Sequence, residues 1–316
     1  MYWIRIVLLS PIAAIYWLIT SIRNWGYDQK ILKSTSFEIP IISVGNLAVG
    51  GTGKTPMVEY LINQLSKKYT IAVLSRGYGR KTSGFLWVEK NQSPSQVGDE
   101  PLQIKCNYDQ ISMAVCENRV IGVQRILKEK PKTSLIILDD AFQHRKIQPK
   151  VSLLLSTYAK PHFKDWLLPA GNLREGRYGG NRADAIIMTK CPENFKPISP
   201  KNKPVFYAKS SYVNPNLDTP VFGFSGLANN NIFKKHLAKS YRLTGFIGFK
   251  DHHVYTQKQL DSLVKKANGA TLICTQKDWV KIKDLKINHT IEKVNMSHQI
   301  IESDKFDNWL VQQIES

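Results

Sequence analysis

The chain has 316 residues, of which 42% are hydrophobic and seven are Trp, which excludes a disordered protein and is typical of one large or two ordinary globular domains. Its net charge of +19 favours an anionic partner such as nucleic acid, anionic lipid or a phosphorylated substrate, with a merely solvated basic surface as the alternative. The four Cys include no C-x-x-C pair. This spacing argues against a disulfide framework or a zinc site and fits a reducing compartment.

The N-terminus is an apolar segment. Residues 6–20 are almost all apolar, with Trp3 before them and Trp25 after them. Fifteen helical residues extend roughly 22 Å, less than the roughly 30 Å of a bilayer core, and Pro11 is expected to interrupt the helix. Because no small-residue cleavage site follows, a signal peptide is disfavoured. The pattern favours an interfacial helix over residues 1–25, with a buried core helix as the alternative.

The next segment has the sequence context of a phosphate-binding loop. Residues 39–44 are an apolar run typical of a buried strand, residues 45–56 are rich in glycine, and residues 57–65 have helical apolar spacing. A strand, a glycine-rich loop and a helix in this order are what a P-loop requires. Lys54 would then reach the β- and γ-phosphates of ATP, and Thr55 would ligate Mg²⁺.

The match to the usual pattern, G-x-x-x-x-G-K-[ST], fails at one position, where Ala48 replaces the first Gly. The remaining glycines let backbone N–H groups converge on phosphate oxygens at a helix N-terminus. The predicted nucleotide-binding residues of the loop are Gly50, Gly51, Thr52, Gly53, Lys54 and Thr55. The alternative is a glycine-rich turn that opens an ordinary helix.

Strands and helices alternate from residue 40 to about residue 210. Apolar strands are predicted at 70–74, 111–116, 134–138, 151–155, 185–188 and 205–210, with helices at 100–106 and 119–129. Continuous apolar strands are buried on both faces, as in a parallel sheet covered by helices. The predicted fold is therefore α/β, a mostly parallel sheet of the P-loop NTPase type.

Polar residues follow several of these strands. Asp139 and Asp140 end the run 134–138, as in a Walker B element that holds Mg²⁺, although many strands end in Asp for other reasons. Arg76 follows the run 70–74 and could grip phosphate oxygens or lie in a plain surface turn. Asp99 opens the predicted helix at 100–106, where it could cap that helix or accept a proton from a hydroxyl nucleophile.

A second, smaller α/β unit is predicted after a Pro- and Asn-containing linker at 214–220. The boundary near residue 217 separates a core domain, 26–216, from a C-terminal domain, 217–316. Its predicted elements are strands at 221–226 and 270–274 and helices at 230–238, 257–267 and 304–314, of which the last could pack on the core. His252 and His253 have no third ligand at helical spacing, so an orienting or acid/base role is favoured over a metal site.

The chain resembles the tetraacyldisaccharide 4′-kinase family, the lipid A 4′-kinases. Each motif alone is modest, but their joint occurrence in this order over nearly the whole chain is specific. The resemblance is carried by residues 44–56, 75–80, 98–101, 139–144, 168–175, 181–184, 224–226, 251–253 and 275–278.

This resemblance implies an enzyme that transfers phosphate from ATP to the 4′-hydroxyl of a tetraacylated disaccharide 1-phosphate. It implies a membrane-associated enzyme at the cytoplasmic face of the bacterial inner membrane. We expect the chain to be a monomer in contact with the anionic membrane surface and not with nucleic acid. It also implies roles for individual residues: Lys54 and Thr55 as P-loop ligands, Asp99 as the base, His252 or His253 as its support, and Asp139, Asp140 and Glu175 at the Mg²⁺ and phosphate site.

The net charge and the P-loop taken alone would also fit a different class of function, namely a nucleotide-dependent switch or a nucleic-acid-binding ATPase. The apolar N-terminus and the lack of a recognisable nucleic-acid module argue against it.

Overall fold

The computed structural model describes residues 2–198, 200 and 203–316, with the side chains of residues 2–7, Trp3 among them, outside the described part. One twelve-stranded sheet runs through the molecule in the order β10-β9-β11-β12-β8-β7-β6-β1-β5-β2-β4-β3. All neighbouring strands in it are parallel except the pairs β8–β12 and β3–β4. The predicted α/β class is therefore confirmed.

The N-terminal part of the sheet contains the predicted apolar strands. They are β1 (Ile41–Asn46), β2 (Ile71–Ser75), β4 (Ser112–Val115), β5 (Leu135–Asp139), β6 (Val151–Thr157), β7 (Ala185–Thr189) and β8 (Val205–Val213), with the short edge strand β3 (Leu86–Trp87). Because β1 lies between β5 and β6, the loops that follow β1 and β5 begin side by side at one edge of the sheet.

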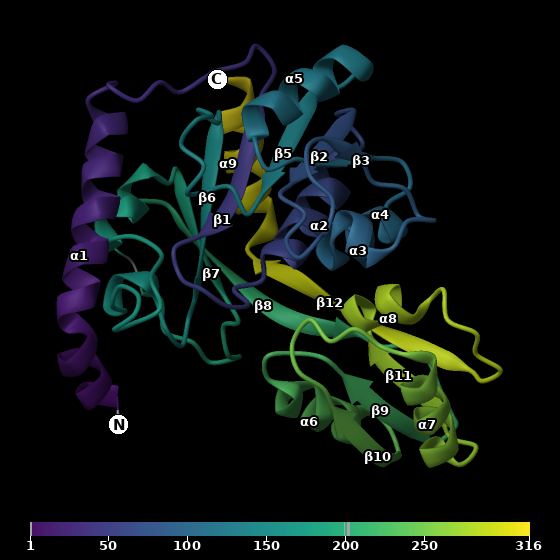
Figure 1. Cartoon of the computed structure of the whole chain (residues 1–316). Helices are drawn as coiled ribbons and strands as arrows, with labels where there is room; N and C mark the ends of the chain where they lie inside the picture. The colour runs from purple at the N-terminus through teal and green to yellow at the C-terminus, as the bar shows by residue number, and fades with distance from the viewer. Residues whose placement is uncertain (1, 199, 201–202) are drawn as a thin grey trace.

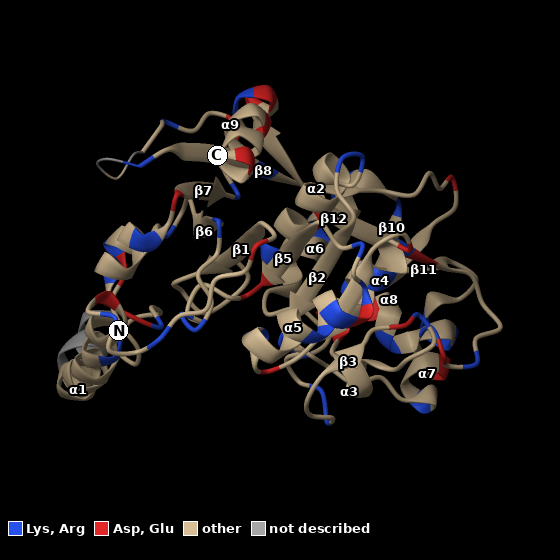
Figure 2. Cartoon of the chain, turned by 90° about the horizontal axis from the view of Figure 1, so that it is seen from above, with Lys and Arg blue, Asp and Glu red and all other residues tan. Residues whose placement is uncertain are grey.

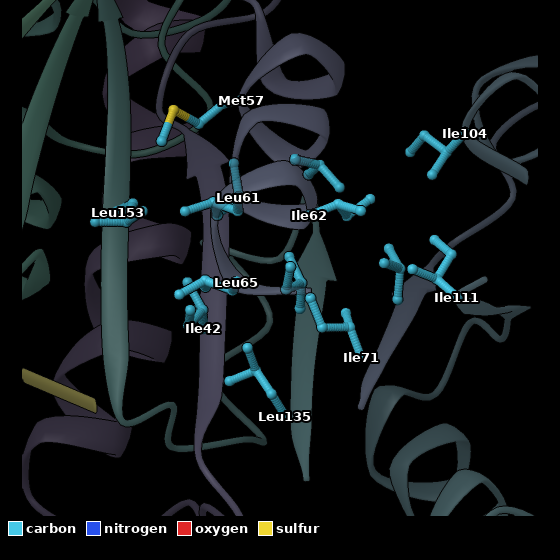
Figure 3. Close-up of a cluster of buried hydrophobic side chains, with 14 of the residues drawn as sticks. Ile42, Met57, Leu61, Ile62, Leu65, Ile71, Ile104, Ile111, Leu135 and Leu153 are labelled. Carbon is cyan, nitrogen blue, oxygen red and sulfur yellow. The ribbon is translucent and has the colours of Figure 1, made fainter. Parts of the chain in front are cut away.

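Helices cover both faces of this part. They are α2 (Lys54–Leu65), α3 (Pro94–Val97), α4 (Asp99–Asn107), α5 (Arg119–Glu129) and the short 3₁₀ helices η1 (His162–Lys164) and η2 (Arg177–Arg182). Figure 3 shows Met57, Leu61 and Leu65 of α2 packed against the sheet near Ile42 of β1. Their complete burial fixes the start of α2 at the end of the glycine-rich loop.

The C-terminal part repeats the pattern on a smaller scale. Its strands are β9 (Val221–Ser225), β10 (Leu243–Gly248), β11 (Thr271–Thr275) and β12 (Ile291–Ile301), and its helices are α6 (Asn230–Ser240), α7 (Gln257–Ala267) and α8 (Gln276–Ile282). The last helix, α9 (Ser303–Glu315), returns to the first part, where Phe306, Leu310 and Ile314 join the core under α2.

The two parts are connected by a pair of long antiparallel strands. Residues 295–301 of β12 pair with β8, while residues 291–294 pair with β11. Figure 1 shows β8 and β12 running from one part to the other. A movement of one part against the other would therefore bend this strand pair.

The N-terminal helix α1 (Tyr2–Asp28) lies along the side of the molecule (Figure 1). It is longer than residues 6–20, and Pro11 lies inside it, so the expected interruption is wrong. Proline removes one backbone hydrogen bond, and here the turns on both sides stay helical. None of the helices in the described part of the chain combines the length and apolar character needed to cross a membrane.

The apolar side chains of α1 are exposed. Leu8 is 74% exposed, Ile15 62% and Trp25 56%. This exposure contradicts the alternative of a buried core helix, because the apolar face packs on nothing in the described structure. The opposite, polar face holds the helix to the core: the Tyr16 hydroxyl donates to the Arg174 carbonyl at 2.8 Å.

Candidate active site

The glycine-rich loop leads from β1 into the first turn of α2. Gly50 and Gly53 have φ angles of 107° and 91°, which favour glycine. Asn46, the last residue of β1, stabilises the loop, because its side-chain amide donates to the Thr52 hydroxyl at 2.8 Å. Lys54 and Thr55 are the first two residues of α2, so the helix N-terminus adds to the attraction for an anion.

Two acidic residues lie at the carboxyl end of β5, at the same edge of the sheet: Asp139 is its last residue and Asp140 follows it. The Lys54 ammonium lies 3.7 Å from Asp140 Oδ1, and Arg174 donates to both Asp140 oxygens at 3.0 and 3.2 Å. Asp139 is almost completely buried, and its Oδ2 accepts a hydrogen bond from the Ser75 hydroxyl at 3.0 Å. Burial and the charges of Glu100 and Asp140 raise the pKa of Asp139 to about 7.

The donor set fits Mg²⁺. Asp139 Oδ1 is buried and has no hydrogen-bond partner among the described residues, and an unpaired buried carboxylate oxygen is costly without a ligand. Mg²⁺ is bound through one or two carboxylates together with substrate phosphates. The described residues include no cluster of three or more His, Cys, Asp or Glu side chains that could hold a metal alone, so phosphate oxygens would have to complete the coordination.

Glu175 lies at the other side of the cavity and is already engaged. Its Oε1 accepts from Arg182 at 2.8 Å and Gln143 at 3.1 Å, and its Oε2 accepts from Asn24 of α1 at 2.6 Å. These bonds neutralise the carboxylate and join α1 to the core. A metal ligand at this position would have to compete with three donors.

The candidate base, Asp99, is paired with one of the two histidines. The His252 Nδ1–H donates to Asp99 Oδ2 at 3.0 Å, across 153 residues of sequence. His253 faces away from this pair: its ring stacks on Phe249 at 4.5 Å, and its Nε2 lies 3.1 Å from the Gln259 side chain. The geometry therefore separates the two histidines, and only His252 contacts Asp99.

Two lysines of α8 complete the environment of Asp99. The ammonium groups of Lys281 and Lys277 lie 3.6 Å and 3.9 Å from Asp99 Oδ2. Figure 2 shows acidic and basic segments lying together near α4 and α8. Burial alone would raise the pKa of Asp99, but the hydrogen bond from His252 and the two lysines outweigh it and lower this pKa to about 2. The same hydrogen bond raises the pKa of His252.

A cavity of about 550 Å³ joins these groups. Its lining includes the predicted residues Arg76, Asp99, Asp139, Asp140, Glu175 and His252, together with Tyr16, Thr20 and Arg23 of α1. The P-loop glycines and His253 are not part of the lining. Lys54 is not part of it either, but forms an ion pair with Asp140, which is. The polar face of α1 thus forms one wall of the cavity, while the apolar face points away from it.

The two arginines after β2 have different surroundings. Arg76 is exposed and lines the cavity, so its guanidinium is available to an anion. Arg80 is bound to Glu117 and donates to the Gly84 carbonyl at 2.6 Å. Arg80 therefore braces the turn and does not reach the cavity.

Sequence reasoning missed several residues that surround the site. Lys277 and Lys281 stand four residues apart, so a helix after the strand at 270–274 would have placed them on one face. Arg119 was also missed. It donates to the Asp139 carbonyl at 3.3 Å, but nothing in the neighbouring sequence distinguishes it from an ordinary first residue of a helix.

The fold and the cavity define a class of protein: a P-loop kinase whose cavity is also lined by a carboxylate–histidine pair. The family model described as tetraacyldisaccharide-1-P 4′-kinase (LpxK) matches residues 5–315. This chain belongs to that family.

Relatives and a solved structure agree. Proteins named tetraacyldisaccharide 4′-kinase from Flavobacterium johnsoniae and Flavobacterium psychrophilum are 39% and 37% identical, over 89% and 98% of this chain and 88% and 96% of their own. LpxK from Aquifex aeolicus, in a crystal structure described as an "apo" form in complex with ATP, is 31% identical and has a TM-score of 0.84, with 98% of this chain and 99% of that chain covered.

Proposed function

We propose that this protein transfers the γ-phosphate of ATP to the 4′-hydroxyl of a tetraacylated glucosamine disaccharide 1-phosphate, giving lipid IVA in lipid A biosynthesis. The observation that carries the proposal is the position of the Asp99–His252 pair. It lines the same cavity as Asp139 and Asp140, which lie beside the P-loop lysine. A phosphate site and a proton acceptor therefore share one space.

The proton of the attacking hydroxyl would pass to the Asp99–His252 pair. The 4′-oxygen bonds to the γ-phosphorus, the bond from that phosphorus to the β–γ bridging oxygen breaks, and ADP leaves. With a pKa of about 2, Asp99 alone is a weak proton acceptor. The raised pKa of His252 lets the imidazole take the hydroxyl proton at Nε2, because Nδ1 already donates its hydrogen to Asp99 Oδ2. Asp99 orients the ring and stabilises its positive charge.

The phosphate groups would lie along the edge formed by the P-loop and β5. The backbone of Gly50 to Gly53 would cradle them, and Lys54 and Arg76 would neutralise charge on the transferred group. Thr55, Asp139 and Asp140 would hold Mg²⁺, with Glu175 further out. When bound, Mg²⁺ supplies charge stabilisation to the phosphate oxygens of ATP.

The exposed apolar face of α1 supports a peripheral position on the inner membrane, at its cytoplasmic face. The acyl chains of the substrate stay in the leaflet, so the enzyme has to work at the lipid surface. An apolar helix face flanked by basic residues is suited to lie in the headgroup region, and Lys or Arg near anionic lipid adds about 1 kcal/mol each.

Two domains, 26–216 and 217–316, would move about the strand pair β8–β12. The support is that Asp99 lies on α4 in the first unit, whereas His252 and the α8 lysines lie in the second. Closure would therefore assemble the proton acceptor only when both units are in place.

A direct test is to incubate the purified protein with ATP, Mg²⁺ and a tetraacyldisaccharide 1-phosphate. The expected product is the lipid with one added phosphate, located on the 4′-oxygen by ³¹P NMR. Hydrolysis of ATP without lipid phosphorylation, stimulated instead by duplex DNA or RNA, would favour the nucleic-acid-dependent ATPase.

A further inference from the structure

Carbonyl groups of the P-loop accept hydrogen bonds from side chains that lie outside the loop. A P-loop binds phosphate because its N–H groups point inward, so its carbonyls must point outward and find donors there. Three successive carbonyls have side-chain donors: Lys190 Nζ on Gly51 at 2.6 Å, Thr189 Oγ1 on Thr52 at 2.8 Å and His298 Nε2 on Gly53 at 2.9 Å.

The third donor differs from the other two in its origin. Thr189 ends β7 and Lys190 follows it, in the same N-terminal part of the sheet as β1 and the loop. His298 lies on β12, 245 residues from Gly53 in sequence, in the stretch where β12 pairs with β8. The P-loop is therefore bonded directly to the strand pair that connects the two parts of the molecule.

The fit between Gly53 and His298 is tight. A Cβ at position 53 would lie 2.2 Å from His298 Nε2, so the imidazole occupies the space that any other residue would fill. His298 is 6% exposed, and burial lowers its pKa to about 4. The ring is thus neutral near pH 7, and because a carbonyl can only accept, Nε2 carries the proton.

The second ring nitrogen is engaged as well. His298 Nδ1 lies 3.3 Å from the Ser210 hydroxyl of β8. With the proton on Nε2, Nδ1 is the acceptor and the hydroxyl donates. A hydroxyl can donate or accept, so Ser210 accommodates the tautomer that the Gly53 carbonyl requires.

We propose that His298 is a positioning residue for ATP: together with the Met57 N–H, which donates to the same oxygen at 3.1 Å, it fixes the Gly53 carbonyl, so that the neighbouring N–H groups face the phosphates. The inference rests on ATP binding at the P-loop, as the proposed function does. Its consequence is that nucleotide affinity depends on a residue of the connecting strand pair that does not line the cavity.

The test is calorimetric titration of the purified full-length protein with ATP and Mg²⁺. Loss of the hydrogen bond in His298→Ala is expected to raise the Kd about tenfold. In His298→Gln the side-chain amide can place a donor where Nε2 stood, so ATP affinity is expected within about threefold of wild type. The shorter His298→Asn reaches the level of Nδ1 only, and is expected to bind ATP as weakly as His298→Ala.

The matched control is His289→Ala. His289 Nε2 also bonds a backbone carbonyl, that of Ala270 at 2.8 Å, but far from the P-loop in sequence and in the C-terminal part. This variant is expected to bind ATP as the wild type does. Thermal unfolding of every variant separates a loss of ATP affinity from a loss of fold.

Equal ATP affinity in wild type, His298→Gln and His298→Asn would overturn the inference, even if His298→Ala fails to fold. An equal loss in His298→Gln and His298→Asn would also overturn it, because the hydrogen-bond donor would then be irrelevant. If the wild type itself does not bind ATP, the proposed function fails first, and the two failures are thereby distinguished.

Discussion

The cavity has two sides that differ in how the chain builds them. The phosphate side consists of the P-loop and the residues after β5, which follow neighbouring parallel strands of one sheet. The acceptor side consists of Asp99, His252 and two lysines, which come from α4, a loop after β10 and α8. The first side exists within one half of the molecule, and the second only where the halves meet.

This difference predicts a division of labour. Groups on the phosphate side should affect ATP binding and the transfer step together, because they touch the nucleotide in both states. Groups on the acceptor side should affect the transfer step alone. The following experiments test this division, from the largest expected effect to the smallest.

Lys54→Met is expected to lower kcat by a factor on the order of 10²–10³ and to weaken ATP binding, because a partly buried charge at the proposed phosphate site is lost. Steady-state kinetics and calorimetry would measure the two effects. Lys68→Met is the control, since Lys68 is exposed and its ammonium pairs with the exposed Glu315. Normal ATP affinity in Lys54→Met would remove Lys54 from the phosphate side.

His252→Ala is expected to lower kcat by roughly 10²-fold, the lower range for a proton-transfer group, with the Kd for ATP unchanged. His253→Ala is the matched control. Because His253 stacks on Phe249 and does not contact Asp99, its loss should cost less than about threefold in kcat. A larger loss in His253→Ala than in His252→Ala would reverse the assignment of the two histidines.

Ile15→Ser on α1 is expected to weaken binding to anionic phospholipid vesicles by about tenfold, because one exposed apolar side chain is removed from the proposed contact. Flotation of the protein with vesicles would measure this, and ATP affinity should stay unchanged. Val254→Ser is the control, since Val254 is 80% exposed but lies in the C-terminal part. Equal vesicle binding by wild type and Ile15→Ser would argue that α1 does not contact lipid.

The pH dependence of kcat should reflect His252. The hydrogen bond to Asp99 raises the pKa of His252 above its usual 6.5, and the neutral ring is the proton acceptor. Activity is therefore full above this raised pKa and is lost as the pH falls through it, so the midpoint should lie above pH 6.5. Titration of Asp99 does not change kcat near neutral pH, because the pKa of Asp99 is about 2. A midpoint near pH 4 would contradict this account.

The phosphate side could be predicted from the sequence because each of its parts is local. A strand, a glycine-rich loop and Lys54 are contiguous, and Asp139 ends a strand whose apolar run is visible in the sequence. The structure adds what long-range packing decides: Lys277 and Lys281 lie beside Asp99, and His298 lies under the P-loop. The exposed apolar face of α1 was expected, but not the polar face that lines the cavity.

Some local features also escaped prediction. The strands β10 and β12 carry Gly, Lys or His among their apolar residues and pair in the smaller part of the sheet. In β12 the alternation is weak, and this strand changes its pairing partner along its length, from β11 to β8. The helix predicted over residues 1–25 agrees closely with α1, but the expected interruption at Pro11 was wrong because proline was given the weight it has in an isolated helix.

The most direct test of the division between the two sides is a single-turnover measurement with Asp99→Asn. Protein saturated with γ-³²P-labelled ATP would be mixed with excess tetraacyldisaccharide 1-phosphate, and label on the lipid would be followed in time. The account predicts that the variant binds ATP as the wild type does but transfers the label roughly 10³-fold more slowly. Transfer at the wild-type rate would contradict it.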